Sequence, residues 1–195
     1  MKPLAIDDEK ARTFLRELAP EDDVFTFGCC DDLASRRDPR LSSPPLRGSL
    51  DACLPTLAWR QAAGCGVFVA VNDVSRWGLA ARYVTKIRAL VADDDRPEDW
   101  PIWGAPDIVT ETAPGRFCCF WRPSGRIAVE DFAEFQTLLG ECVNGAPTVR
   151  DAAVTVRLPG TLNFENPNNP FRVKLVKPAL ACAQPEMRRA AGGGS

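Results

Sequence analysis

Three consecutive aspartates, Asp93 to Asp95, follow the apolar segment 86–92 and are the residues of this chain best suited to chemistry. We interpret 86–92 as a short buried strand, and successive side chains of a strand alternate between its two faces. Asp93 and Asp95 therefore share one face, while Asp94 points to the other as a solvated or ion-paired group. Two carboxylates on one rigid face can bind a divalent metal that stabilises the oxygens in nucleotidyl transfer. The same acidic run also suits the solvated start of a loop, which is the more common reading of such a pattern.

The composition is that of an ordinary globular protein and constrains function only weakly. The 195 residues include 24 Lys and Arg against 26 Asp and Glu, so the net charge is −2, and 45% are hydrophobic. This balance neither requires nor excludes nucleic-acid binding, which needs only a local basic face. No apolar run approaches the ~20 residues that span a bilayer, and the start of the sequence lacks a signal-peptide core. We therefore expect a cytoplasmic chain with no membrane partner.

Histidine is absent, and eight cysteines are present, none of them spaced as Cys-x-x-Cys. The lack of histidine excludes a Cys2His2 or Cys3His zinc site, a histidine-based triad and a histidine general base within this chain. Most of the cysteines lie in apolar segments, where a free thiol behaves as a small hydrophobic side chain. We expect them to be reduced and buried.

Hydrophobic periodicity predicts the helices that must position these residues. It indicates helices over 6–19, about 50–63 and 129–143, and a further short helix over 148–153. Ser49 is the expected N-cap of the second helix. In the third helix, five residues are expected to face the core: Phe132, Phe135, Leu138, Leu139 and Cys142.

The remaining apolar segments predict strands at 24–27, 66–71, 86–92 and 171–176. A hairpin is predicted from 107–111 and 116–121, because Pro114-Gly115 between them suits a tight turn. Strands interleaved with helices, together with one hairpin, indicate an α+β or mixed α/β domain. Residues 179–195 read as a flexible tail or linker.

Three segments, taken in their order along the chain, resemble one family. They are Arg88–Asp95 with its acidic strand end, Glu111–Trp121 with Glu-Thr-x-Pro-Gly-Arg-Phe-x-Cys-Phe-Trp, and Val156–Asn163 with Arg-Leu-Pro-Gly-Thr-x-Asn. The segments Arg47–Asp51 and Gly66–Asn72 fit the upstream part of the pattern. Together they resemble the RepB-like branch of the archaeo-eukaryotic primase superfamily, the primase-polymerases of plasmids, phages and integrated elements. The resemblance covers about residues 22–177 and is more specific than any single motif.

The resemblance implies an α+β fold and a division of the chain. The implied catalytic unit, about 85–178, has an antiparallel sheet like that of an RNA-recognition motif, with flanking helices. An N-terminal α/β unit of about 1–84 joins it, so that 1–178 form a single primase-polymerase-like domain.

The resemblance also implies a chemistry, the joining of nucleotides on a DNA template. The family's Asp-x-Asp motif holds the catalytic metals, Mg²⁺ or Mn²⁺, and maps to Asp93 and Asp95. A second motif binds the phosphates of the incoming nucleotide and maps to Cys118, with Arg116 beside it; Arg157, in the third matching segment, is a further expected phosphate contact. The implied partners are template DNA, nucleoside triphosphates and a helicase or replication-initiator domain.

The sequence departs from the family pattern at positions that would do this chemistry. Cys118 stands where the family has a phosphate-binding histidine, and a neutral thiol is a poor donor to phosphate. A further metal carboxylate is expected at Ala146, and its loss would weaken a second metal unless the nearby Asp151 replaces it as a ligand. Relatives carry a small polar residue, an arginine, a basic residue and a histidine where this chain has Ala113, Thr155, Glu165 and Arg47.

Basic and aromatic side chains suggest a surface for nucleic acid. Residues 150–177 carry an excess of three positive charges, from Arg150, Arg157, Arg172, Lys174 and Lys177 against Asp151 and Glu165. Such an excess can form a face for the phosphate backbone. Trp100, Trp103 and Trp121 can stack on bases, although aromatic residues more often belong to the core or its rim. Arg116 and Arg122 can likewise meet phosphate or be ordinary surface arginines.

Three functions follow from these observations. The first is a DNA primase-polymerase domain of a mobile-element replication protein. The second is a relative that kept the fold and binds nucleic acid or nucleotide but has lost catalysis, as the departures suggest. The third is a different metal-dependent nuclease or phosphatase built around the aspartate cluster.

Overall fold

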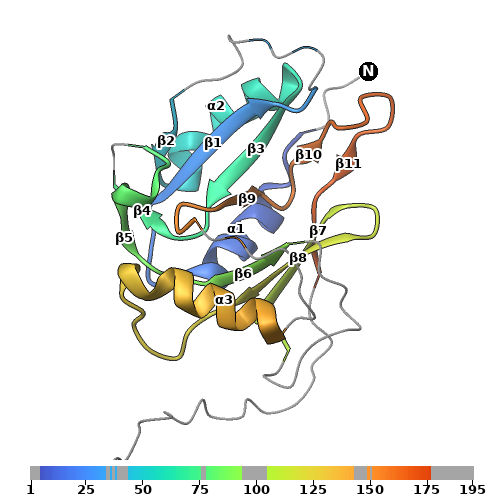
Figure 1. Ribbon diagram of the computed structural model, residues 1–195. Helices are drawn as coiled ribbons and strands as arrows, with labels where there is room; N and C mark the ends of the chain where they lie inside the picture. The colour runs from blue at the N-terminus through green and yellow to red at the C-terminus, as the bar shows by residue number, and fades with distance from the viewer. Residues whose placement is uncertain are drawn as a thin grey trace, which may run out of the picture.

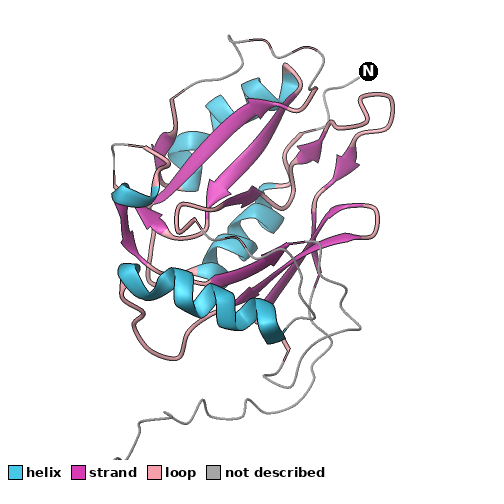
Figure 2. Cartoon of the chain, viewed as in Figure 1, coloured by secondary structure: helices cyan, strands magenta, loops and turns pink. Residues whose placement is uncertain are grey.

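The computed structural model describes residues 5–33, 36, 38, 44–75, 78–93, 105–142, 149 and 151–176. Two four-stranded antiparallel sheets and three α-helices make up most of this part of the chain, as Figures 1 and 2 show. The α+β class expected from the sequence is therefore confirmed.

The first sheet combines strands from both halves of the chain. Its order is β2 (Leu46–Gly48), β1 (Phe25–Asp31), β3 (Cys65–Ala70) and β9 (Thr155–Arg157), with antiparallel neighbours throughout. Helix α2 (Leu50–Ala62) packs on this sheet and begins at Ser49, whose hydroxyl accepts a hydrogen bond from the N–H of Ala52 as predicted. Because β9 pairs with β3, residues beyond 84 complete the N-terminal sheet; the division at about residue 84 stays a prediction.

The second sheet contains the predicted hairpin. Its order is β12 (Lys174–Val176), β7 (Ile108–Ala113), β8 (Arg116–Trp121) and β6 (Leu90–Asp93), again antiparallel. Helix α1 (Asp8–Leu18) lies between the two sheets in Figure 1 and packs the ring of Phe14 edge-on against Phe120 of β8, with 5.5 Å between ring centroids. One apolar core therefore joins α1, α2 and both sheets.

Short elements complete the fold. Two two-stranded sheets pair β4 (Asp73–Val74) with β5 (Val84–Lys86) and β10 (Leu162–Asn163) with β11 (Phe171–Arg172). Two 3-10 turns, η1 (Ala81–Tyr83) and η3 (Val129–Asp131), precede β5 and α3. The described part of 148–153 forms a turn, so the short helix predicted there is wrong for those residues.

The predicted strand over 86–92 is interrupted by a contact from a distant part of the chain. β5 ends at Lys86 and β6 begins at Leu90, and the two strands belong to different sheets. At the break, Oδ1 of the buried Asn72 accepts hydrogen bonds from the N–H groups of Arg88 (2.8 Å) and Ala89 (3.3 Å). A side-chain amide thus replaces the strand partner, which periodicity within 86–92 could not indicate.

Helix α3 (Phe132–Cys142) confirms part of its predicted inward face: Phe132 and Leu139 are buried, and the side chain of Cys142 lies outside the described residues. Phe132 and Gln136 are buried, whereas Phe135 and Leu138 are 40% and 41% exposed, so their predicted inward orientation is wrong. Gln136 accepts a hydrogen bond from the N–H of Val91 (2.8 Å) and donates to the carbonyl of Val91 (2.9 Å). The buried amide therefore forms the backbone hydrogen bonds that no described strand forms at the outer edge of β6. A pattern of hydrophobic residues does not indicate such a role.

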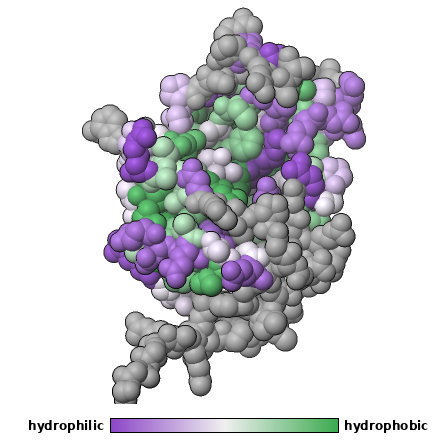
Figure 3. Space-filling view, viewed as in Figure 1, coloured by the Kyte–Doolittle hydropathy of each residue, from purple (hydrophilic) through white to green (hydrophobic). Residues whose placement is uncertain are grey.

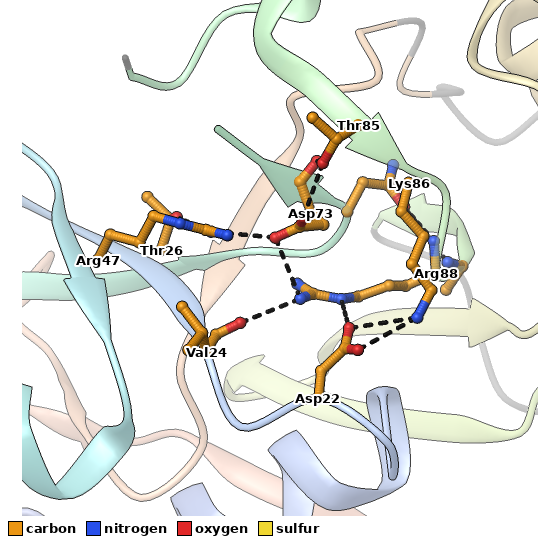
Figure 4. A network of polar contacts seen from close by, with 10 residues as sticks. Asp22, Val24, Thr26, Arg47, Asp73, Thr85, Lys86 and Arg88 are labelled. Atoms are coloured by element: carbon orange, nitrogen blue, oxygen red, sulfur yellow. Dashed lines mark hydrogen bonds and ion pairs between the residues drawn. The ribbon is translucent and has the colours of Figure 1, made fainter. Parts of the chain in front are cut away.

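A buried polar network connects the start of the first sheet to β4 and β5 (Figure 4). The Arg88 side chain is 2% exposed and donates from Nε to Asp22 (2.8 Å) and from Nη2 to Asp73 (3.4 Å). Lys86 also binds Asp22, and Arg47 binds Asp73. Burial alone would raise the pKa of Asp22, but the hydrogen bonds from Arg88 and Lys86 outweigh it and hold this pKa below its ordinary value.

The described cysteines agree with the expectation of reduced, mostly buried thiols. Five of the six free cysteines are buried and one, Cys30, is exposed. Burial raises the pKa of the Cys65 thiol to about 11, which keeps it neutral at physiological pH. Within the described ranges, no helix is both long and apolar enough to cross a bilayer.

Candidate functional site

A pocket of about 230 Å³ lies where the two sheets meet. Strands β3 and β9 of the first sheet, strands β6 to β8 of the second, and the residues after β10 line it. Its polar lining consists of Asp93, Thr112, Arg116, Cys118, Thr155, Arg157 and Glu165. Figure 3 shows hydrophobic surface at the centre of this face of the molecule and hydrophilic surface at its right, over β10 and β11.

Strand register brings two of the predicted site residues together at the second sheet. Asp93 is the last residue of β6 and lies opposite Cys118 of β8. The Asp93 side chain is exposed, whereas Cys118 is 2% exposed and sits in the wall of the pocket. Arg116 is the first residue of β8, two positions before Cys118 along the same strand. Alternation along the strand therefore places Arg116 and Cys118 on one face.

Arg157 enters the pocket from the first sheet and is held by a buried carboxylate. Its Nη1 donates to both oxygens of Asp32, at 3.0 and 2.9 Å, and the side chains of Arg157 and Asp32 are 11% and 1% exposed. The N–H of Phe164 donates a further hydrogen bond to Asp32 (2.9 Å). The guanidinium carbon of Arg157 also lies 4.8 Å from the ring centroid of Phe68. These contacts fix both the position and the plane of the guanidinium group.

Gly66 permits this arrangement by having no side chain. A Cβ at this position would collide with Oδ1 of Asp32 and with Nη1 of Arg157. Gly66 lies on β3 opposite Cys30, so the missing Cβ leaves room for the ion pair against the sheet. Packing therefore explains why residue 66 is a glycine. It begins the segment Gly66–Asn72, which fits the family pattern.

Glu165 bridges the two pocket arginines. Its Oε1 accepts from Nη2 of Arg157 at 3.0 Å, and its Oε2 accepts from Nη1 of Arg116 at 3.3 Å. The turn that carries it is fixed by Asn163, which accepts from the N–H of Glu165 and donates to the carbonyl of Thr112, both at 2.9 Å. A position that departs from the family pattern therefore supplies an acid that pairs with both arginines.

Asp32, which holds Arg157, and Phe68, which lines the pocket, are residues of the site that sequence reasoning did not identify. Asp32 lies 125 residues before Arg157, just after β1, in a run of charged residues with no recognisable spacing to either arginine. Phe68 reads as an ordinary residue of an apolar strand. Only the pairing of β3 with both β1 and β9 brings these side chains together.

The predicted metal ligands are only partly within the described residues. Asp93 lines the pocket, whereas Asp94, Asp95 and Ala146 lie outside the described residues. Asp151 is exposed, accepts a hydrogen bond from the N–H of Ala153 (2.8 Å) and is not among the residues that line the pocket. No group of three or more His, Cys, Asp or Glu residues within the described ranges could hold a metal ion. The described carboxylates alone do not make a metal site, and the fit of Mg²⁺ or Mn²⁺ depends on Asp95.

The predicted basic face consists of individually paired side chains where it is described. Nη1 of Arg172 donates to the carbonyls of Ala5 (3.0 Å) and Gly160 (2.6 Å), and Lys174 pairs with Glu111 at 2.8 Å. Burial would raise the pKa of Glu111, but hydrogen bonds from Lys174 and from a backbone N–H hold it below its ordinary value. Arg150 and Lys177, also counted in this face, lie outside the described residues.

Of the three tryptophans predicted to stack on bases, one lies within the described residues. Trp121 is partly buried and packs against the small cluster of Ala92 and Leu139, at the rim of the core. Trp100 and Trp103 lie outside the described residues. Arg122 pairs with Asp107 at 3.7 Å on the surface. Base stacking and phosphate contact by these residues stay predictions.

No protein-family model matches the sequence, and no curated protein matches it. Solved structures do match it, over most of its length. The chain is 16% identical to the AEP domain of the cyanophage S-2L primase-polymerase, with a TM-score of 0.68, over 92% of this chain and 95% of that domain. It is 18% identical to the catalytic domain of primase RepB' in complex with initiator DNA, with a TM-score of 0.63, over 86% of this chain and 82% of that one.

A structure of the RepB' primase matches 87% of this chain with 17% identity and a TM-score of 0.65. The match covers 55% of that RepB' chain, so this chain spans about half of its length. Identities this low establish the fold and leave residue roles to be tested. The resemblance carried by the three motifs is thus confirmed in the fold: the chain has the fold of the RepB' and phage primase-polymerase domains.

Proposed function

We propose that this chain is a primase-polymerase-type nucleotidyltransferase domain of a plasmid, phage or mobile-element replication protein, which adds nucleotides on a DNA template. The observation that carries the proposal is the convergence of Asp93, Arg116, Cys118 and Arg157 on one pocket. These residues come from three motifs that are far apart in the sequence. Two arginines facing one cavity suit the phosphates of a nucleoside triphosphate, because guanidinium groups bind phosphate oxygens in a fixed geometry.

The roles of the residues follow from their chemistry. Arg116 and Arg157 bind and orient the triphosphate, and Cys118 packs in the pocket wall beside them. Asp93, together with Asp95, would hold Mg²⁺ or Mn²⁺. When bound, the metal would neutralise charge on the phosphate oxygens during attack by a primer hydroxyl. The proposed partners are template DNA, nucleoside triphosphates and a helicase or replication-initiator domain.

A non-catalytic binding function is the second candidate, and the thiol of Cys118 favours it. This side chain is buried and offers phosphate only a weak donor where the family pattern has histidine. Such a protein would bind nucleotide or DNA through the same arginines without turnover. Metal-dependent cleavage of DNA without incorporation would instead indicate a nuclease built on Asp93.

Template-dependent incorporation of labelled nucleotides in the presence of Mn²⁺ tests the first proposal. We expect incorporation by the chain to fall at least about 100-fold in Asp93→Asn, because the variant loses a charged metal ligand. A double variant, Cys118→His with Ala146→Asp, restores the family residues at both departures. Incorporation by the double variant and none by the parent chain would contradict catalysis here and support the binding function.

A further inference from the structure

The Glu165 carboxylate occupies the space between the two arginines to which the proposed function assigns the phosphates. One of its oxygens binds Arg157 and the other binds Arg116, at 3.0 and 3.3 Å. Two acceptor oxygens shared between two guanidinium groups are also how a phosphate group is held. We propose that Glu165 is an internal stand-in for phosphate and that an anion of the triphosphate class binds by displacing it. This inference rests on the proposed function and adds a step to it.

Arg157 cannot follow Glu165 out of the pocket. Asp32 holds its Nη1 through both carboxylate oxygens, and the Asp32 side chain is 1% exposed. The backbone N–H of Phe164 fixes Asp32 in turn, and the pair lies so close to Gly66 that an added Cβ would collide with it. Breaking this contact would leave a charge buried without a partner, which is costly. An incoming anion therefore meets an arginine whose Nη2 keeps its direction.

Glu165 itself can leave at low cost. Its side chain is 49% exposed, and that of Arg116 is 48% exposed, so water screens the ion pair between them. The backbone of Glu165 is bound by Asn163 and need not move, because rotation about the side-chain bonds suffices to swing the carboxylate into solvent. Of the two acids that hold Arg157, Glu165 is therefore the one that a ligand replaces.

The charges of the pocket give this displacement a consequence for affinity. The lining carries two arginines against the carboxylates of Asp93 and Glu165, so it has no positive excess while Glu165 is in place. When Glu165 swings out, Nη2 of Arg157 and Nη1 of Arg116 lose this acceptor and can bind the ligand in its place. Glu165 thus competes with every anion for the same donors, and removing its charge should tighten anion binding.

Calorimetric titration of the full chain with inorganic tripolyphosphate, in buffer without divalent metal, measures this competition. We expect Glu165→Gln to bind tripolyphosphate about three- to tenfold more tightly than the parent chain, since the charge that pairs with Arg116 and Arg157 no longer competes with the ligand. Glu111→Gln is the matched control, because it makes the same charge change at a glutamate that pairs with Lys174 and does not line the pocket. We expect the control to stay within about twofold of the parent.

Arg157→Gln separates this inference from the proposed phosphate site. Loss of tripolyphosphate binding in Arg157→Gln, with no gain in Glu165→Gln, would overturn the inference and leave the phosphate site standing. Unchanged binding in Arg157→Gln would reject the phosphate site and the inference together, as would the absence of binding in every variant. An equal gain in tripolyphosphate affinity in Glu111→Gln would show that the effect comes from the net charge of the chain and would overturn the inference. Glu165→Ser repeats the test if the glutamine variant fails to fold.

Discussion

At the scale of single residues, the direction of Arg157 is set by a carboxylate that does not itself line the pocket. Asp32 is 1% exposed and accepts three hydrogen bonds, two of them from Arg157. A buried carboxylate with its charge and hydrogen bonds satisfied acts as a fixed anchor for its partner. The arginine can then present its remaining donors to the pocket without reorganising when a ligand binds, which favours binding.

Substituting Gly66 by alanine should disturb this anchor. The new Cβ would collide with Asp32 and Arg157, both of which are held by other contacts. We expect Gly66→Ala to lower the free energy of unfolding by about 1–3 kcal/mol, as in overpacked cores. Urea denaturation followed by circular dichroism measures it.

Gly125→Ala is the control for this substitution, because no atom lies within 4 Å of the Cβ it would add. The control should change stability by less than about 1 kcal/mol, since alanine at an open position mainly restricts the unfolded chain. Equal stabilities for the two variants would show that Asp32 and Arg157 move away from the new Cβ at little cost.

At the scale of elements, the pocket depends on an edge strand that is supported by a helix. β6 pairs with β8 on one side only, and its last residue is Asp93. On the other side, Gln136 of α3 completes the hydrogen bonds of Val91 and also donates to the carbonyl of Val149, at 2.8 Å. Val91 and Val149 both line the pocket, so α3 positions its wall through one buried amide.

Replacing Gln136 by leucine should therefore destabilise the protein despite the apolar surroundings. The variant would leave the N–H and carbonyl of Val91 and the carbonyl of Val149 without this partner. We expect a loss of about 2–4 kcal/mol in the free energy of unfolding, because buried backbone groups without partners are costly.

Glu134→Ala, at an exposed position of the same helix, serves as the control and should cost less than about 0.5 kcal/mol. Chemical denaturation of both variants at one pH gives the comparison. A Gln136→Leu variant as stable as the parent would mean that hydrophobic burial fully replaces the amide.

At the scale of the whole molecule, three features tie distant parts of the chain together. The strand β9 extends the first sheet, α1 packs between the sheets, and the Arg88 network joins the chain before β1 to β4 and β5. The side chain of Arg88 is almost fully buried, and its Nη1 has no hydrogen-bond partner within the described residues. The network therefore stabilises the fold only while its carboxylates remain ionised.

The lowered pKa of Asp22 predicts a specific sensitivity to acid. Because the folded-state pKa lies below the ordinary aspartate value of 3.8, the contribution of Asp22 to stability is complete above that value. It is lost as the pH falls below 3.8 and through the lower folded-state pKa. We expect Asp22→Asn to be less stable than the parent at neutral pH and to lose less stability on acidification.

Unfolding by urea at a series of pH values between neutrality and about pH 2 measures this difference. Asp23→Asn, at the exposed neighbouring position, makes the same change of charge and should keep the acid response of the parent. Parallel pH profiles for Asp22→Asn and the parent would contradict the assigned role of the network.

The sequence by itself determined the features that depend on a few neighbouring residues. The hairpin around Pro114-Gly115, the cap at Ser49 and the α+β class follow from turn chemistry, capping and periodicity, and the structure contains all three. The three motifs also identified four residues that line the pocket: Asp93, Arg116, Cys118 and Arg157.

Only the tertiary structure decided which side chains meet across the chain. The break at 87–89 comes from Asn72, the buried face of α3 from Gln136, and the anchor of Arg157 from Asp32. In the pocket, Glu165 became the partner of both arginines because the turn after β10 lies beside β8 and β9. Local patterns specify elements through interactions over a few residues, whereas these contacts join groups far apart in the sequence and exist only once strand pairing has fixed the topology.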